Sequence, residues 1–359
     1  MPDKKSFVVA CGGTGGHVFP GLAVANALRE RGHEVTVWLS GRDIEQSTLG
    51  SWDGPVFATG ARQLSLRNSV AMLKSFFRCL KELKANRPDA LLAMGSYSSL
   101  PPVMAAKFRR VPVMLHEANA VPGKAVDFLA RFADFVAISF KETSKCLTGR
   151  ETVFTGLPVR KTLCGQDPFD NLPKGAFVLL VTGGSQGAHR VNELVSKALC
   201  LLKKHGTHPF YVIHQCGKND VEWLEKLYQE NGVPGQVSAF IPEMGRAYAS
   251  ADFVVSRAGA STCFELCLLG KPALLIPLPQ AVRNHQHLNA TALVTAGAAD
   301  EGSQNEMTEW ALMRYLDHKI ADPEKVREMS QKMLELAVPD AAERVAQALE
   351  KLAGRSNKS

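Results

Sequence analysis

A glycine-rich turn that ends in an imidazole side chain is the stretch of this sequence best equipped for chemistry. Residues 12–16 hold four glycines, and His17 follows them directly. Glycine lets the main chain approach a ligand closely, and the N–H groups at a helix start favour anions and hydroxyls. His17 would face that ligand with a side chain that exchanges a proton near neutral pH. The turn is therefore suited to phosphates or sugar hydroxyls.

A second turn of the same kind occurs in the other half of the chain. Residues 183–187 contain three glycines and follow an apolar run at 177–182, just as residues 12–16 follow one at 7–11. Neither turn has the Gly-x-Gly-x-x-Gly spacing of dinucleotide-binding proteins. No acidic residue stands at the end of a clear next strand after the first turn, where it would bind a ribose. A nicotinamide-dependent dehydrogenase is therefore disfavoured.

Polar side chains follow another apolar run of the first half. Glu117 and Asn119 come after the run at 112–115 and are candidates for holding a hydroxyl. Their neighbour His116 is more typical of a structural histidine. Ligands of parallel sheets collect at the carboxyl ends of strands, so polar residues there carry more weight than those on ordinary surface.

In the second half, Glu265 follows an apolar run at 253–255 and a turn of small residues. A helix is predicted to begin near Ser261, so its first N–H groups can receive a diphosphate while Glu265 accepts hydrogen bonds from the cis hydroxyls of a ribose. Glu265 can equally serve only to complement the helix dipole. The polar stretch 278–290, which includes Gln286, is rich in amide and imidazole groups suited to sugar hydroxyls.

These residues require two α/β units to position them. Apolar runs typical of buried parallel strands alternate with amphipathic helices, and the first helix is expected to begin at Pro20. The polar stretch 161–174 predicts a hinge. We therefore expect domains at 1–160 and 161–339, and a final helix within 340–359 that can cross back to the first domain. The two similar halves would face each other across an active-site cleft.

Composition limits the class of protein. The 359 residues are 45% hydrophobic and 21% charged, which is typical of a soluble globular protein with two domains. The eight cysteines are scattered without a Cys-x-x-Cys pair, which indicates a reducing compartment. No apolar run approaches a signal-peptide core or the roughly 20 residues of a membrane span. The net charge of +7 favours an anionic partner, and the 7% aromatic content argues against nucleic acid.

A basic segment in the first half is a candidate membrane contact. Residues 62–87 hold seven Lys or Arg and one acidic residue, with apolar residues at helical spacing. A basic amphipathic helix can lie on anionic lipid headgroups, where each cation contributes about 1 kcal/mol. The alternative is a helix that packs its apolar stripe on the sheet and exposes its basic face to solvent. A second basic patch at 107–110 favours the membrane interpretation.

Six motifs along nearly the whole chain resemble those of the family 28 glycosyltransferases, which add N-acetylglucosamine to lipid-linked N-acetylmuramyl-pentapeptide in bacterial peptidoglycan synthesis. They are GGTGGHVFPGLAVA, HEAN, GLPVR, GGSQGAHRVN, AGAST followed by Glu265, and NHQHLNA. The resemblance implies a GT-B fold, with two Rossmann-like, doubly wound domains around a cleft. It implies inverting transfer from UDP-N-acetylglucosamine, without cofactor or metal, to the 4-hydroxyl of N-acetylmuramyl-(pentapeptide)-diphospho-undecaprenol (lipid I). The enzyme would act as a peripheral protein on the cytoplasmic face of the inner membrane.

The resemblance also assigns ligands to individual residues. The second domain would bind the donor, with Glu265 on the ribose, Ser185 on the diphosphate and Gln286 on the sugar hydroxyls. Ile241 would face the uracil through its backbone, and Arg160 would reach the nucleotide sugar from the hinge. The other expected binding residues are Ala260, Ser261, Thr262, Cys263 and Phe264 along the nucleotide, and Thr14, Gly15, Gly16 and Asn119 on the acceptor- and membrane-facing first domain.

The implied transfer needs a base that takes the proton of the acceptor hydroxyl, which contributes about 10²–10⁴-fold to the rate. We expect His17 to be that base, because its ordinary pKa suits proton removal at cytoplasmic pH, and Glu117 is the alternative. N–H groups of the second glycine turn and of the helix at Ser261 would stabilise the charge on departing UDP in place of a metal.

The chain departs from the family at three positions. Leu157, Ala118 and Phe264 stand where Asn, Gln and often Ser are usual. The first two departures can alter hydrogen bonding on the acceptor side. Rival interpretations of the same motifs are another GT-B lipid glycosyltransferase, a UDP-N-acetylglucosamine 2-epimerase, or a non-catalytic membrane subunit that binds a nucleotide sugar. The intact His17 and Gln286 argue against the last of these.

Overall fold

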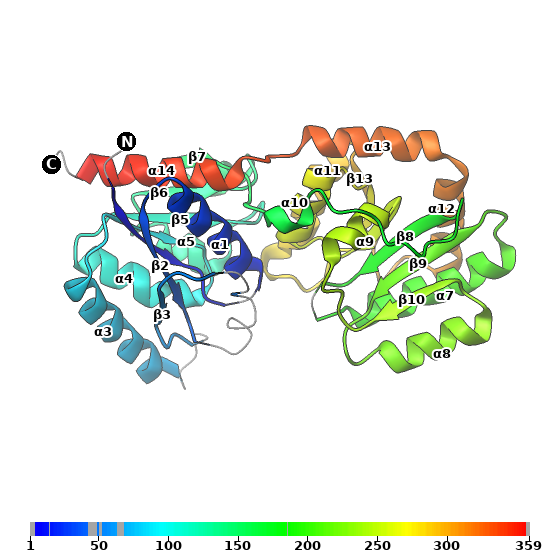
Figure 1. The fold of residues 1–359 in the computed structure, drawn as a ribbon, viewed down its shortest axis with the longest axis horizontal. Helices are drawn as coiled ribbons and strands as arrows, with labels where there is room; N and C mark the ends of the chain where they lie inside the picture. The colour runs from blue at the N-terminus through cyan, green and yellow to red at the C-terminus, as the bar shows by residue number, and fades with distance from the viewer. Residues whose placement is uncertain are drawn as a thin grey trace. The chain divides into compact units, whose positions relative to one another are not determined.

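The computed structural model describes residues 4–13, 15–41, 49, 52–62, 68–184 and 186–356. The chain divides into two compact units (Figure 1), one comprising residues 1–160 and 338–359 and the other residues 161–337. Each unit is built on a parallel sheet with helices packed against it. The α/β class expected from the alternation of apolar runs and helices is confirmed.

The first unit contains a seven-stranded sheet in the order β3-β2-β1-β4-β5-β6-β7, with every neighbouring pair parallel. The central strands are continuous apolar runs buried on both faces, as parallel sheets covered by helices require. The strands are β1 (Ser6–Ala10), β2 (Glu34–Leu39), β3 (Val56–Ala58), β4 (Ala90–Ala93), β5 (Val113–Glu117), β6 (Phe135–Ile138) and β7 (Thr152–Phe154). The helices are α1 (Gly15–Glu30), α3 (Ser69–Ala85), α4 (Leu100–Phe108), α5 (Lys124–Leu129), α6 (Thr143–Cys146) and α14 (Ala341–Ser356), with a 3-10 turn, η2, at Tyr97–Ser99.

The second unit repeats this plan with a six-stranded parallel sheet in the order β10-β9-β8-β11-β12-β13. The strands are β8 (Phe177–Thr182), β9 (Phe210–Gln215), β10 (Gly235–Ser238), β11 (Phe253–Ser256), β12 (Ala273–Leu275) and β13 (Ala299–Glu301). The helices are α7 (His189–His205), α8 (Val221–Asn231), α9 (Met244–Ser250), α10 (Ala260–Leu269), α11 (His285–Thr295), α12 (Glu309–Ala321) and α13 (Pro323–Glu335), with 3-10 turns η3 (Lys161–Leu163) and η4 (Val282–Asn284).

The order of the strands reverses at an equivalent place in both sheets. In the first sheet β1 lies between β2 and β4, and in the second β8 lies between β9 and β11. Ligands of doubly wound sheets bind outside the carboxyl ends of the strands at such a reversal. Both glycine turns follow these strands directly, so each unit presents its turn where a ligand is expected.

Some sequence predictions about the elements were wrong. The first helix begins at Gly15, not at Pro20, which lies inside it. Pro20 has no N–H to donate to the Gly16 carbonyl and its ring crowds that carbonyl, so the helix continues through Pro20 at a cost in stability. The short edge strands β3 and β13 were not predicted, and two of the three residues in β13 are acidic.

The helix α14 completes the core of the first unit. It lies beside α1 (Figure 1), and Val345, Leu349 and Leu352 belong to the same buried cluster as Phe7 of β1. At the surface, Glu350 accepts two hydrogen bonds from the Arg31 guanidinium, at 2.7 and 2.8 Å.

Candidate functional site

The first glycine turn lies against the loop that follows β4. Gly13 has a φ of 130°, and a Cβ added there would stand 2.9 Å from the Ser96 Oγ atom, so only glycine fits this approach. Ser98 ties the two segments together, because its hydroxyl donates a 2.6 Å hydrogen bond to the Gly12 carbonyl. Gly15 and Gly16 form the first turn of α1, whose leading N–H groups have no partner within the helix. Thr14 lies outside the described residues.

The imidazole of His17 is oriented by the end of β4. Its Nδ1 atom lies 2.9 Å from the Met94 carbonyl oxygen, which can only accept, so Nδ1 carries the proton. The Nε2 atom is then an acceptor, and among the described residues it makes no hydrogen bond. The side chain is half-buried, and this burial lowers the pKa of His17 from 6.5 despite the hydrogen bond to Met94. His17 is therefore a neutral imidazole at neutral pH with a lone pair available.

Glu117, the last residue of β5, holds the loop that follows it. One carboxylate oxygen accepts hydrogen bonds from the main-chain and side-chain N–H groups of Asn119, at 2.8 and 3.0 Å. The other accepts from the Gly123 N–H at 2.9 Å. The side chain is buried, and burial raises the pKa of Glu117 while the N–H donors oppose that shift. Asn119 is thus fixed beside Glu117 at the same edge of the sheet.

His116 and Arg160 complete the predicted residues of the first unit. His116 is fully buried and lies 3.2 Å from the Gly156 carbonyl through Nε2, and its burial lowers the pKa to about 4. This agrees with the structural role expected for it. The Arg160 guanidinium stacks on the ring of Phe19 in α1, at 4.1 Å from the ring centre. Arg160 is therefore anchored to the same helix that carries His17.

The second glycine turn packs tightly against the end of β9. Gly187 has a φ of 74°, and a Cβ there would lie 2.0 Å from the Cys216 carbonyl oxygen. The preceding residues of the turn are held by Gln215, whose side-chain amide donates to the Gly184 carbonyl at 2.9 Å. Ser185 lies outside the described residues. The described glycines of this turn are thus held by close packing and hydrogen bonds in front of α7.

The start of α10 offers backbone donors at the carboxyl edge of the same sheet, after the strand next to β8. Gly259 is the N-cap, and Ala260, Ser261 and Thr262 form the first turn of the helix. The first N–H groups of a helix have no partner within it, so they favour an anion. Cys263 and Phe264 are buried, and burial raises the pKa of the Cys263 thiol, so these two can contribute only through the main chain.

Glu265 is oriented by a neighbouring helix. The Tyr248 hydroxyl on α9 donates a 3.0 Å hydrogen bond to one carboxylate oxygen of Glu265. Tyr248 is 2% exposed, whereas Glu265 is half-buried. The buried tyrosine therefore fixes the orientation of the Glu265 carboxylate, which remains partly exposed at the surface of the unit.

The remaining predicted residues are held through main-chain contacts. The peptide N–H of Ile241 donates to the Gln215 Oε1 atom at 3.1 Å. Gln286, on the first turn of α11, accepts a hydrogen bond from the Leu278 N–H at 2.9 Å, so its Nε2 group is the part left to face a ligand.

Three residues that organise the site were missed by sequence reasoning. Met94 contributes a main-chain oxygen, and Gln215 and Tyr248 act from buried positions on elements far away in the chain. For Gln215 a signal existed, because it ends a mostly apolar strand, whereas Tyr248 lies on a short helix of mixed composition that gives no such signal. No signal identified Met94, since any residue has a carbonyl.

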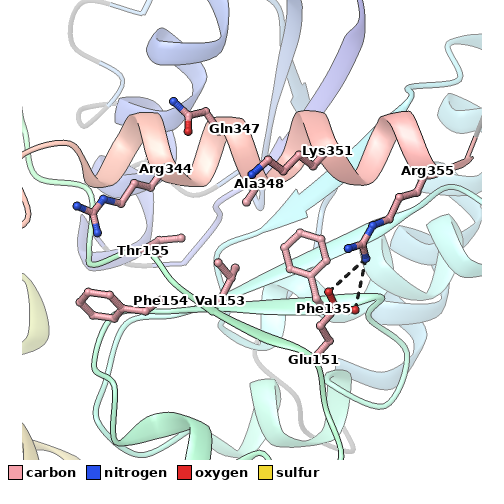
Figure 2. A pocket seen from close by; sticks show the side chains of 10 residues that line it. All are labelled: Phe135, Glu151, Val153, Phe154, Thr155, Arg344, Gln347, Ala348, Lys351 and Arg355. Carbon is pink, nitrogen blue, oxygen red and sulfur yellow. Dashed lines mark hydrogen bonds and ion pairs between the residues drawn. The ribbon is translucent and has the colours of Figure 1, made fainter.

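A separate cavity of about 260 Å³ lies between α14 and the strands β6 and β7 of the first unit (Figure 2). Phe135 and Val153 form part of its apolar wall, and Lys351 and Arg355 are among its cations. Arg355 pairs with Glu151 across it at 3.2 Å. None of the predicted site residues lines this cavity, so the strand-order reversals remain the candidate site.

In the part of the chain that the structure describes, no three His, Cys, Asp or Glu side chains come together as a metal site would require. Among the same residues, no helix combines the length and the apolar character needed to cross a bilayer.

Known proteins that match this chain over most of its length show the family to which it belongs. The family 28 glycosyltransferase N-terminal domain matches residues 7–138, and the C-terminal domain of the same family matches residues 178–345. A relative from Geobacter metallireducens is 37% identical over 348 residues, which are 94% of this chain and 95% of that protein. Its name is UDP-N-acetylglucosamine–N-acetylmuramyl-(pentapeptide) pyrophosphoryl-undecaprenol N-acetylglucosamine transferase. This chain belongs to glycosyltransferase family 28.

Solved structures agree with membership of family 28. The crystal structure of Acinetobacter baumannii MurG matches with a TM-score of 0.79 and 32% identity, over 97% of this chain and 99% of that one. A UDP-GlcNAc 2-epimerase from Neisseria meningitidis matches with a TM-score of 0.71 at 15% identity, over 96% of this chain and 100% of that one, which shows a shared fold alone. The GT-B fold of two Rossmann-like domains, expected from the motifs, is confirmed.

The departures from the usual residues of family 28 lie inside the units. Leu157, Ala118 and Phe264 are at most 7% exposed. The apolar side chains at these positions are part of the buried core. This chain therefore has apolar packing where polar side chains are usual in the family. The hydrogen bonds that orient His17 and Glu265 come from Met94 and Tyr248 and not from these three residues.

Proposed function

We propose that this protein transfers N-acetylglucosamine from UDP-N-acetylglucosamine to the 4-hydroxyl of N-acetylmuramyl-(pentapeptide)-diphospho-undecaprenol, with inversion at the sugar. The names of relatives that match over nearly the whole chain support this reaction. The observation on which it rests most is His17, held by Met94 at the strand-order reversal with its Nε2 lone pair available. A hydroxyl is a poor nucleophile until a base takes its proton, and this imidazole is placed to do so.

The donor is assigned to the second unit. The start of α10, which includes Ser261, offers N–H groups to a diphosphate. In the turn after β8 the N–H groups of Gly184 and Gly187 donate to Thr182 and Gly184, so Ser185 is the residue of that segment proposed to contact the diphosphate. The carboxylate of Glu265, fixed by Tyr248, would accept hydrogen bonds from the ribose hydroxyls. Gln286 would donate its amide to the N-acetylglucosamine.

The acceptor is assigned to the first unit. The turn at Gly15 and Gly16 and the loop that carries Asn119 both lie at the carboxyl edge of its sheet. His17 is the better base of the two candidates, because both oxygens of Glu117 already accept hydrogen bonds. Glu117 would hold the loop that positions Asn119.

The leaving group is UDP, whose diphosphate gains charge as the sugar departs. Preorganised N–H donors at a helix start stabilise such charge without a metal. Arg160, stacked on Phe19, would add a cation near the nucleotide sugar. We therefore expect the reaction to proceed in the presence of EDTA.

A peripheral contact with an anionic membrane is assigned to α3 and the end of α4. The helix α3 buries Met72, Ser75, Cys79 and Leu83. Leu73 and Phe77, expected from spacing to belong to an apolar stripe, are 57% and 58% exposed, and Phe108 at the end of α4 is 71% exposed. Phe76 bridges Phe77 and Phe108, with ring centres 5.5 and 6.5 Å away.

This apolar surface is flanked by cations. The exposed basic residues of the two helices and the turn after α4 include Lys74, Lys81, Lys84, Lys107 and Arg110. An apolar surface rimmed by cations fits the boundary between anionic headgroups and acyl chains. The inner leaflet of the bacterial membrane, where the lipid-linked acceptor resides, is the proposed partner.

One assay tests the reaction. Labelled UDP-N-acetylglucosamine is incubated with a short-chain lipid I analogue, with EDTA, and the disaccharide lipid is separated from free sugar. Transfer that depends on the acceptor supports the proposal. Conversion of the donor without acceptor would indicate an epimerase, and donor binding without any conversion would indicate a non-catalytic subunit.

A further inference from the structure

The cavity between α14 and the strands β6 and β7 lies along the edge of the first sheet. Its wall is partly apolar, and its volume is about 260 Å³. Figure 2 shows Arg344 near Thr155 at one end of it, and at the other end Arg355 pairs with Glu151 at 3.2 Å. Thr155 follows the last residue of β7, so the Arg344 end lies at the carboxyl edge of the sheet, to which the acceptor is assigned.

The wall of this cavity has an excess of positive charge. Its charged residues are Arg344, Lys351, Arg355 and Glu151, of which only the last is acidic. Arg355 is paired with Glu151, and Arg344 donates to Asp340 through its Nε atom alone, at 2.9 Å. Within the part of the chain that the structure describes, Lys351 takes part in no ion pair. Lys351 and the terminal NH₂ groups of Arg344 are therefore available to an anion.

The strand β7 offers main-chain groups along the same cavity. It is the last strand of the sheet, and its ladder with β6 uses the carbonyl of Glu151 and the N–H of Thr155. Alternate residues of a strand direct their main-chain groups to opposite sides, so those of Thr152 and Phe154 point outward from the sheet. An extended peptide can pair with such an edge.

The cavity and the proposed membrane contact belong to opposite faces of the sheet. Phe7 of β1 packs in one cluster with Leu349 of α14, whereas the next residue, Val8, packs in another with Leu83 of α3. Successive side chains of a strand point to opposite faces, so α14 and α3 cover different sides (Figure 1). A ligand of the cavity is therefore a water-soluble group and not a headgroup of the bilayer that α3 contacts.

The acceptor of the proposed reaction has a water-soluble, anionic part of this kind. In N-acetylmuramic acid the peptide is attached through its amino end to the lactyl group, on the carbon next to the one that carries the 4-hydroxyl, and it ends in a carboxylate. From Met94, which orients His17, to Thr155 there are three strand spacings, about 14 Å. Five extended residues span about 17 Å, so the peptide can reach the cavity while the 4-hydroxyl stays at His17.

We propose that the cavity between α14 and β7 is a subsite for the peptide of the lipid-linked acceptor. The peptide lies extended beside β7, and Lys351 and Arg344 bind its carboxylates. The proposal rests on the transfer reaction proposed above. Lys351 and Arg344 take no part in the chemical step, so their contribution is to acceptor binding alone.

The test varies the charge of the peptide and the charge of the cavity together. Two short-chain lipid I analogues are compared, one with free peptide carboxylates and one with these carboxylates converted to amides. The double variant Arg344→Gln with Lys351→Gln removes the two available cations, and Arg344→Lys with Lys351→Arg keeps them. The control, Arg131→Gln with Lys145→Gln, removes two exposed cations of the same unit that do not line the cavity. The kcat and the acceptor KM are measured for each protein.

In the wild type, the control and the charge-conserving variant, amidation of the peptide should raise the acceptor KM about fivefold, the equivalent of two partly exposed ion pairs. In Arg344→Gln with Lys351→Gln, the free-carboxylate acceptor should already show this higher KM, with kcat retained and no further effect of amidation. An unchanged KM for that acceptor in the folded variant, or an equal rise for both acceptors, would overturn the proposal.

Failure of the proposed function gives a different result. If the wild type transferred sugar to neither acceptor, the transfer reaction itself would be wrong. If it transferred to both with the same KM, only the peptide subsite would be wrong. Thermal unfolding identifies any variant that fails to fold. Lys351→Gln alone breaks no ion pair of the described residues, so it remains informative if the double variant does not fold, with an expected rise of about twofold in KM for the free-carboxylate acceptor only.

Discussion

The Nδ1 atom of His17 lies 2.9 Å from the carbonyl oxygen of Met94, the residue that follows β4. This contact decides which ring nitrogen carries the proton, and so leaves Nε2 as the basic atom. It also joins the start of α1 to the neighbouring strand at the strand-order reversal. The imidazole of His17 is thus oriented by a main-chain carbonyl at the end of a sheet strand and not by a flexible side chain.

Replacing His17 tests the base directly. His17→Ala should lower kcat by about 10²–10⁴-fold with little change in donor affinity, because the proton of the acceptor hydroxyl loses its acceptor. His17→Asn is the matched variant, since its side-chain amide can still donate to the Met94 carbonyl while offering no base. Steady-state kinetics with a lipid I analogue measure both. Normal turnover in either variant would remove His17 from this role.

The pH dependence of the reaction should follow the same group. Burial lowers the pKa of His17 below 6.5, and the base works only when neutral, above that lowered pKa. We expect the midpoint of the acid limb of kcat/KM to lie below pH 6.5. A pH profile of kcat/KM measures this limb. A midpoint above 6.5 would contradict the burial of the imidazole.

The carboxylate of Glu265 should matter for donor binding more than for turnover. Glu265→Ala is expected to raise the donor KM by more than it lowers kcat, because the ribose contact exists before the reaction as well as during it. Tyr248→Phe removes the hydroxyl that orients this carboxylate and should raise the donor KM about three- to tenfold. Neither change should alter the KM of the acceptor. An unaltered donor KM in Glu265→Ala would rule out the ribose assignment.

Charge reversal on α3 tests the membrane surface. Lys81→Glu with Lys84→Glu should weaken binding to vesicles that contain anionic lipid by at least about tenfold, since each cation near such a surface contributes about 1 kcal/mol. Arg78 is left unchanged because its guanidinium stacks on Phe57 within the fold. Vesicle sedimentation measures binding, and activity on a detergent-soluble acceptor should be retained.

The control for that experiment reverses two exposed cations elsewhere in the first unit. Lys145→Glu with Arg150→Glu changes the net charge by the same amount but lies outside α3 and α4. Vesicle binding equal to the wild type is expected for this control. If both pairs weakened binding equally, net charge and not a defined surface would be responsible.

The stability of the first unit should depend on pH through His116. Its pKa is about 4 in the folded protein and about 6.5 when unfolded, so the unfolded chain binds the extra proton between these values. The free energy of unfolding should therefore be constant above pH 6.5 and fall by about 3 kcal/mol on lowering the pH to 4. Urea unfolding at a series of pH values measures this, and His116→Gln should lose that part of the dependence.

The sequence identified the elements whose signals are local. Continuous apolar runs predicted β1 and β8. The glycines after these runs predicted both turns, because close backbone approach and a positive φ both require glycine. Short edge strands such as β3 and β13 left no such trace, since they gain stability from a neighbour. The start of α1 was misplaced because proline is favoured at the first position of a helix and disfavoured in its interior, whereas Pro20 lies inside α1.

The contacts that orient the site could not be read from spacing. His17 was found, but its partner Met94 contributes only a carbonyl from a distant strand. On α3, helical periodicity grouped Leu73 and Phe77 with the packed stripe, whereas the packed residues are Met72, Ser75, Cys79 and Leu83. Periodicity gives the width of an apolar face, but the crossing of the helix over the sheet decides which part of that face is covered.

The return of α14 to the first unit has a consequence for synthesis on the ribosome. Val345, Leu349 and Leu352 fill the same core as β1, although more than three hundred residues separate them in translation. The second unit, residues 161–337, emerges whole before these side chains do. The amino-terminal unit, although made first, is thus completed last, and the nascent chain keeps an apolar surface uncovered until its final helix has left the exit tunnel.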